Sequence, residues 1–178
     1  GVPGFKLPDG IEAGLEATHY FQPSQAAYAN GSHVAEVEVD IETGAVKILR
    51  YVVAHDCGNL INPLIVDGQV QGGVAHGIGN ALLEHLYYDE NANPLTTTFS
   101  EYLLPTAELV PNVEILHLES PTPNNPLGVK GAGEGGTLPA AAVIAAAIDN
   151  ALSPFGVRFK DVPIRPHQIV AAVNEATN

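Results

Sequence analysis

One carboxylate in this sequence, Glu134, is surrounded by glycines and is a candidate for acid–base chemistry. Glu134 lies in the run GVKGAGEGG, directly ahead of a strongly helical stretch over residues 138–152. Glycines lose more conformational entropy on ordering than other residues do, and in return the backbone can approach a bulky ligand closely. A carboxylate in such a loop is a candidate general acid or base. The alternative is a tight loop in which Glu134 only favours the N-terminus of the following helix, and the local sequence leaves both interpretations open.

The same glycines satisfy the Gly-x-Gly-x-x-Gly pattern of dinucleotide-binding loops, through Gly131, Gly133 and Gly136. That motif should follow a strand directly and lead to an acidic residue about 20 positions later. Here a proline-rich loop precedes it, and the next acid, Asp149, lies inside the predicted helix. The match to a dinucleotide site is therefore weak. A P-loop is excluded, because the Gly-Lys-Ser/Thr sequence is missing.

A second group of glycines surrounds Gln69 on a predicted helix. Gly68, Gly72 and Gly73 leave room beside it for a large ligand or for another backbone segment. The Gln69 amide can both donate and accept hydrogen bonds, which suits ligand binding. A helix–helix contact lined by small residues, with Gln69 bonded to a neighbouring carbonyl, explains the same pattern. Local sequence does not separate the two.

The remaining metal-binding or nucleophilic side chains do not form a recognisable site. The seven histidines are scattered without the i, i+4 spacing of a helical zinc pair, and Cys57 has no Cys-x-x-Cys partner. His55, Asp56 and Cys57 are consecutive, but adjacent strand residues point to opposite faces. We therefore predict no side-chain metal site and expect Cys57 to be an ordinary buried thiol.

Composition indicates a globular protein. The 178 residues are 46% hydrophobic and only 15% charged, and the formal net charge of −13 disfavours nucleic acid as a partner. No apolar run is long enough to span a bilayer, and the N-terminal segment lacks a signal-peptide core. We expect a cytoplasmic protein, although a single cysteine does not exclude the periplasm. Because the sequence holds no Met, even at position 1, we expect a processed product, a fragment or an excised piece.

Periodicity predicts an α+β fold in which mixed strands pack with about three helices. After an N-terminal loop over residues 1–14, strands are expected at 16–21, 32–40, 45–54 and 113–118, with a further hairpin formed by 87–88 and 95–99. Helices are expected at 62–84, as a buried helix capped by Asn62, at 139–152, capped by Thr137 and packed in the interior, and at 166–174.

Two blocks taken together resemble a known family. They are HDCGNLINPLIVDGQVQGGVAHGIGNALLEH at 55–85 and GVKGAGEGGTLPAAAVIAAAIDNAL at 128–152. In that order they are similar to the C-terminal part of the molybdopterin-binding large subunit of the xanthine oxidase family of molybdenum hydroxylases. The bacterial aldehyde oxidoreductases, N-heterocycle dehydrogenases and carbon monoxide dehydrogenase large subunits are closest in character. The resemblance assigns residues 15–178 to the C-terminal portion of a molybdenum cofactor-binding domain.

The resemblance implies a role for several residues. Glu134 matches the glutamate that lies beside molybdenum and acts as the base, and Gln69 matches a glutamine that hydrogen-bonds the pterin. Lys130 matches a lysine with a positional or electrostatic role, and the backbone of Gly131, Ala132 and Gly133 would approach the cofactor. The pterin dithiolene, rather than protein side chains, would hold the metal. Glycines follow Glu134 where some animal members have two prolines, so substrate shape cannot be inferred from those enzymes.

The resemblance further implies an oxidoreductase that works only within a larger assembly. It would insert a water-derived oxygen into an aldehyde or an aromatic N-heterocycle, using molybdenum–molybdopterin in the cytosine dinucleotide form. The rest of the large subunit, or a complementary chain, would complete the site. Iron–sulfur and FAD-binding partners would carry the electrons away. The alternatives are a non-catalytic nucleotide-binding module and a structural subunit of an oxidoreductase complex.

Overall fold

The computed structural model describes residues 8–10, 14 and 16–178, and it has the α+β architecture predicted from the sequence. A three-stranded sheet packs with three α-helices and one short 3-10 helix. In chain order the elements are β1 (Asn30–Val39), β2 (Val46–Asp56), α1 (Pro63–Leu82), β3 (Val113–Leu118), α2 (Ala140–Ala151), η1 (Ser153–Phe155) and α3 (Pro166–Thr177).

Strands β1 and β2 form the predicted antiparallel hairpin. Along β1, alternate residues are half-buried and exposed, as expected of a strand with one covered face. The register shifts between Glu36 and Val37, where β2 carries one extra residue. This bulge reverses which positions of β2 face inward, so that Ile48 and then Tyr51 both lie on the covered side.

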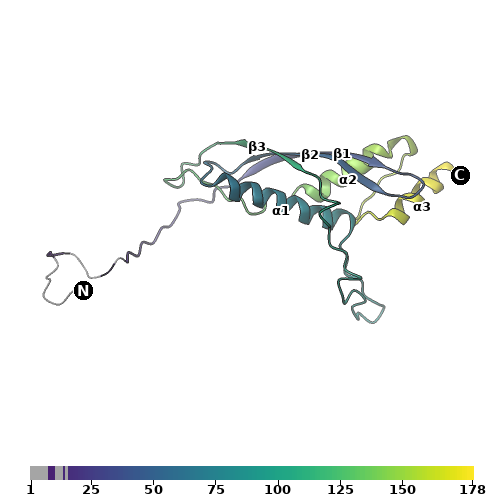
Figure 1. Cartoon of the computed structure of the whole chain (residues 1–178), viewed down its shortest axis with the longest axis horizontal. Helices are drawn as coiled ribbons and strands as arrows, with labels where there is room; N and C mark the ends of the chain where they lie inside the picture. The colour runs from purple at the N-terminus through teal and green to yellow at the C-terminus, as the bar shows by residue number, and fades with distance from the viewer. Residues whose placement is uncertain (1–7, 11–13, 15) are drawn as a thin grey trace.

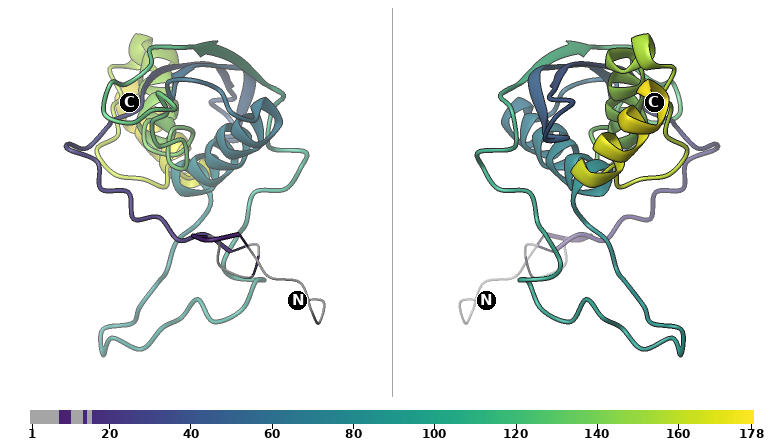
Figure 2. Two further views of the ribbon diagram at one scale, coloured as in Figure 1. Left: turned by 90° about the vertical axis from the view of Figure 1, so that its left-hand side faces the viewer. Right: turned by 90° about the vertical axis from the view of Figure 1, so that its right-hand side faces the viewer.

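The third strand converts the hairpin into a mixed sheet of order β1-β2-β3. β3 pairs with β2 in parallel, and α1 lies in the crossover between them. α1 and α2 lie side by side beneath one face of the sheet, and none of the described helices covers the other face (Figures 1 and 2). The core lies between these layers and includes Tyr51, Ile78 and Ile144.

Helix α1 begins as its sequence predicts, but it is buried on one side only. The Asn62 side chain accepts a hydrogen bond from the Ile65 amide at 3.3 Å, and Pro63 occupies the first turn. Val70 and Val74 are fully buried, whereas Leu64 is 80% exposed. The predicted buried helix is therefore buried along the side that the sheet and α2 cover, and it is exposed on the other side.

Four further expectations about the elements are corrected. Residues 16–21 form no strand, and the predicted hairpin at 87–99 is reduced to one isolated bridge between Tyr88 and Pro94. Pro139, rather than Thr137, stands at the N-cap of α2, and no side chain caps it. Helix α2 is also only partly interior, since three of its residues are buried. The N-terminal loop predicted at 1–14 lies largely outside the described residues.

Close contact between backbones explains one of the α1 glycines. A Cβ at Gly73 would lie 2.8 Å from the backbone of Gly136, too close for ordinary packing. At the neighbouring Gly72, a Cβ would meet nothing within 4 Å. The two glycines therefore have different reasons for being there, although they are adjacent in sequence.

This difference gives a prediction about stability. Gly73→Ala is expected to lower the free energy of unfolding by about 1–3 kcal/mol, because the added methyl group pushes the Gly136 segment away from α1. Gly72→Ala is the matched control, and it should raise stability by about 0.5–1 kcal/mol, as alanine does inside a helix. Urea unfolding followed by circular dichroism measures both. Equal effects of the two variants would contradict the contact.

The helices of the structure can be compared with the length and apolarity that a membrane span requires. Within residues 8–10, 14 and 16–178, none of the helices combines the length and the apolarity needed to cross a membrane.

Candidate functional site

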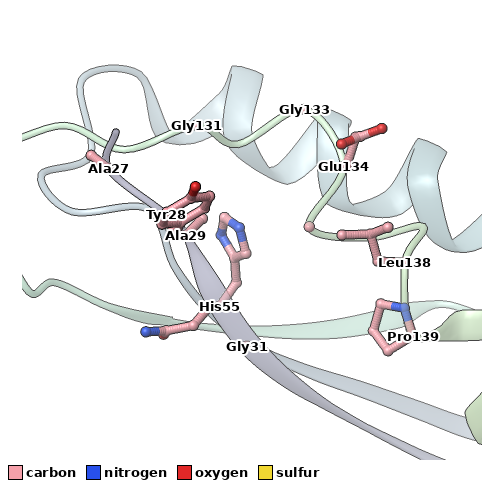
Figure 3. A pocket seen from close by; sticks show the side chains of 12 residues that line it. Ala27, Tyr28, Ala29, Gly31, His55, Gly131, Gly133, Glu134, Leu138 and Pro139 are labelled. Carbon is pink, nitrogen blue, oxygen red and sulfur yellow. The ribbon is translucent and has the colours of Figure 1, made fainter. Parts of the chain in front are cut away.

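A cavity of about 670 Å³ opens beside the loop that carries Glu134. One wall is the segment leading into β1, another is β2, and a third is the 131–139 loop (Figure 3). Tyr28, His55 and Leu138 are among its larger lining side chains. Glu134 also lines the cavity and is exposed, and its carboxylate extends from the loop on the side away from His55.

The two sequence blocks that carry the predicted site residues meet in space. The Gln69 amide nitrogen lies 3.8 Å from the place that a Cβ on Gly133 would occupy. Next to it, Gly136 packs so closely on the Val70 carbonyl that a side chain there would overlap it. Gln69 is exposed, so its amide remains accessible beside the loop. The structure thus brings Gln69, Gly133 and Glu134 into one region.

The glycines around Gln69 face two different surroundings. At Gly68 and Gly72 a Cβ would have open space within 4 Å, whereas Gly73 receives the Gly136 backbone. The sequence left a ligand and a second backbone as alternatives: a second backbone lies at Gly73, and the side of Gly68 and Gly72 is open. The open side is the one available to a ligand.

Lys130 anchors the start of the same loop. Its Nζ lies 3.4 Å from Asp56 Oδ1, with the two side chains 12% and 5% exposed. Its backbone N–H donates to the Cys57 carbonyl at 2.7 Å. The Ser120 hydroxyl, the Gly58 N–H and Lys130 together hold the pKa of the Asp56 carboxyl well below its usual range. Asp56 is therefore charged, and Lys130 is directed to it.

Cys57 behaves as the sequence suggests. The thiol is buried, with 4% of the residue exposed, and burial raises its pKa. A thiol that stays protonated is a poor nucleophile. Nothing in its surroundings indicates a catalytic role.

His55 also lines this cavity, and the sequence did not single it out. It is 1% exposed and lines the cavity, and neither ring nitrogen has a hydrogen-bond partner among the described residues. Gly135 lies against the ring so closely that a Cβ there would overlap Nε2. Burial, and then the neighbouring His117, lower the pKa of His55, which favours the neutral ring. The sequence could have indicated its burial, because His55 follows the inward-facing Val53 by two residues in a predicted strand.

His117 extends this cluster toward α1. It is the Cα partner of His55 in the parallel β2–β3 pair, and the two rings meet edge to face with centroids 6.4 Å apart. Its Nε2 lies 2.6 Å from Asp67 Oδ1. The contact ties β3 to the helix that presents Gln69.

These features suit a large organic ligand with hydrogen-bonding edges. No backbone N–H from Gly131 to Gly136 donates to another group in the described part of the chain, and Gly131 and Gly133 are exposed. Gln69 adds a donor and an acceptor, and the open space at Gly68 and Gly72 admits a flat molecule. Among the described residues there is no cluster of three or more His, Cys, Asp or Glu that could hold a metal ion.

The glycine loop does not have the context of a dinucleotide-binding motif. β3 ends at Leu118, and the segment from there to Gly131 contains no further strand. The glycines therefore do not form the strand–turn–helix unit that such a motif requires.

Comparison with known proteins gives concordant matches. A family model described as a molybdopterin cofactor-binding domain matches residues 7–111. The nicotine 6-hydroxylase large subunit of Paenarthrobacter nicotinovorans is 44% identical over 167 residues, which is 94% of this chain and 20% of that protein. The carbon monoxide dehydrogenase large chain of Hydrogenophaga pseudoflava is 34% identical over 168 residues, or 94% and 21%.

Solved structures agree with these sequence matches. Quinoline 2-oxidoreductase from Pseudomonas putida 86 superimposes with a TM-score of 0.89 at 43% identity, covering 95% of this chain and 22% of that one. The chain thus spans about a fifth of the length of the proteins that it matches.

Proposed function

Because this chain belongs to the molybdopterin cofactor-binding domain family, we propose that it is part of a molybdenum hydroxylase and supplies the catalytic base and part of the pterin-binding surface. The reaction would be oxidation of a carbon centre with oxygen derived from water. The chain would act only together with the remaining part of a longer subunit, since it spans about a fifth of its relatives.

One observation carries this proposal. Glu134 lines a cavity of about 670 Å³, and its loop packs directly on the helix that presents Gln69. Glu134 and Gln69 are far apart in sequence, and neither local pattern alone distinguishes a functional residue from a structural one. Their convergence beside open space supports a shared ligand.

The family resemblance assigns the residues that would hold the pterin, and the geometry of the loop supports that assignment. Gln69 would hydrogen-bond its edge, and the backbone N–H groups of Gly131, Ala132 and Gly133 would add donors. When bound, the molybdenum–pterin group would supply the two-electron redox chemistry that side chains lack. Lys130 would act indirectly, by fixing the start of the loop through Asp56.

Glu134 would serve as the base. A carboxylate oxygen would accept a proton from the water-derived nucleophile as that nucleophile attacks carbon. In the chain alone the Glu134 side chain is exposed. The remaining part of the subunit would cover it and exclude bulk water, which strengthens electrostatic interactions in the site.

An aromatic N-heterocycle is the substrate class that we favour over an aldehyde. Two similar proteins are described as a nicotine 6-hydroxylase and a quinoline 2-oxidoreductase, and both named substrates contain such rings. Tyr28, Leu138 and Pro139 give the cavity apolar walls that suit a flat ring. Iron–sulfur and flavin partners, the cytosine dinucleotide form of the cofactor and a cytoplasmic location complete the proposal.

Cofactor retention by the complete subunit tests the proposal. The purified protein is expected to contain molybdenum and pterin, and Gln69→Leu should speed their loss on dialysis about tenfold, the weight of roughly one hydrogen bond to the ligand. Gln71→Leu, an exposed glutamine on the same helix, is the control and should change little. A complete subunit purified without molybdenum or pterin would contradict the proposed function.

A further inference from the structure

Both ring nitrogens of His33 are used, and one of them reaches the Glu134 loop. His33 lies on β1 and is half-buried. Its Nε2 is 3.0 Å from the Gly135 carbonyl oxygen, and its Nδ1 is 2.9 Å from the Tyr51 hydroxyl oxygen. Gly135 directly follows Glu134, so His33 bonds to the backbone next to the proposed base.

The direction of these hydrogen bonds follows from their chemistry. A carbonyl oxygen can only accept, so His33 Nε2 carries the hydrogen and donates it to Gly135. In a neutral imidazole the other nitrogen is an acceptor, so the Tyr51 hydroxyl donates to Nδ1. Burial lowers the pKa of His33 and raises that of Tyr51, which keeps the ring neutral and the phenol protonated. The result is a chain of two hydrogen bonds, from the Tyr51 hydroxyl to His33 and from His33 to the Gly135 carbonyl.

Few other hydrogen bonds hold this part of the loop. In the described part of the chain, the His33 bond is the only side-chain hydrogen bond to the backbone of residues 131–136. The neighbouring Glu134 carbonyl accepts from the Thr137 and Leu138 amides, which closes a turn. The Gly135 backbone also lies against the His55 ring. Gly135 thus lies beside two histidines, and one of them hydrogen-bonds its carbonyl.

We infer that His33, held in its tautomer by Tyr51, is a positioning residue that sets the location of the Glu134 carboxylate through the Gly135 carbonyl. This inference rests on the proposed role of Glu134. His33 does not itself contact the reacting atoms. Without its hydrogen bond the peptide after Glu134 could rotate, and the carboxylate would sample orientations in which it cannot take the proton.

Kinetics of the complete enzyme separate this role from simple packing. His33→Leu is expected to lower kcat about tenfold with KM nearly unchanged, the weight of about one hydrogen bond acting in the transition state. His33→Gln should restore most of the rate, because its amide can donate to Gly135 and accept from Tyr51. Tyr51→Phe should have a smaller effect of the same kind. His167→Leu, at an exposed position on α3, is the control.

Amide hydrogen exchange gives a readout that does not depend on turnover. The Thr137 and Leu138 amides, which bond to the Glu134 carbonyl, should exchange faster in His33→Leu and return toward normal in His33→Gln. Unchanged exchange and unchanged kcat in His33→Leu would overturn the inference. If His33→Leu fails to fold, His33→Gln and Tyr51→Phe still test it by the same two measurements.

A double variant distinguishes failure of this inference from failure of the proposed function. In a Glu134→Gln background, His33→Leu should cause little further loss of kcat, because the group that it positions is already disabled. A full additional tenfold loss there would overturn the positioning role and leave the role of Glu134 intact. Full activity of the Glu134→Gln single variant would instead overturn the proposed function.

Discussion

Replacing Glu134 with glutamine in the complete molybdenum-containing enzyme is expected to lower kcat by at least ~10²-fold, the low end for a positioned general base. Glutamine matches glutamate in size and polarity, so the loop on α1 should keep its geometry. It cannot accept the proton that the proposed reaction delivers to a carboxylate oxygen. Turnover of an aromatic N-heterocycle measures the effect, and elemental analysis of molybdenum shows whether the cofactor is retained.

The control separates a specific loss from a general effect of removing charge. Glu175→Gln removes a carboxylate at an exposed position on α3 and should leave kcat and metal content unchanged. Retained turnover in the Glu134 variant would remove its assigned role as base. A variant that loses molybdenum together with activity would indicate that Glu134 supports cofactor binding rather than proton transfer.

Features of the fold that depend on nearby residues could be predicted from sequence. The β1–β2 hairpin, the Asn62 cap of α1 and the start of α3 at Pro166 all follow from local periodicity and capping chemistry. Each involves interactions within one element or between neighbours in the chain. Such interactions are read from residue type and spacing alone.

Features that depend on strand register or on packing between distant residues could not be predicted from the sequence. The bulge near Leu49 reverses the inward-facing positions of β2, and alternation in the sequence does not reveal where an extra residue falls. Gly72 and Gly73 look equivalent in the sequence, yet one faces open space and the other a backbone. A helix turns about 100° per residue, so the contact partner decides their roles.

Some residues of the candidate site could be predicted from the sequence and others could not. Glu134 and Gln69 were singled out by unusual local composition and by the family resemblance. His33 and His55 were not, because nothing in the spacing of the histidines suggests that two of them lie beside Gly135. That arrangement exists only after the sheet has formed and the glycine loop has docked on it.

Asp56 and Lys130 form the buried contact that holds the beginning of this loop. Both side chains are nearly inaccessible, and the Asp56 carboxylate also accepts from the Gly58 and Ser120 N–H groups at 2.9 and 3.2 Å. These bonds link the end of β2, the segment after β3 and the glycine loop. Removing one partner of a buried pair leaves the other charged group without compensation, which costs more than the pair itself contributes.

Asp56→Ala is therefore expected to lower the free energy of unfolding by about 3–5 kcal/mol, measured by urea denaturation at pH 7. The double variant Asp56→Ala/Lys130→Met should recover part of this loss, because it removes the unpaired ammonium group. The folded-state pKa of Asp56 is lowered, so its contribution is complete above an ordinary aspartate pKa of about 3.9 and is lost as the pH falls through the folded value. The difference between wild type and Asp56→Ala should accordingly be constant above about pH 5 and shrink below about pH 4. A double variant less stable than Asp56→Ala would show that Lys130 is held by contacts other than this carboxylate.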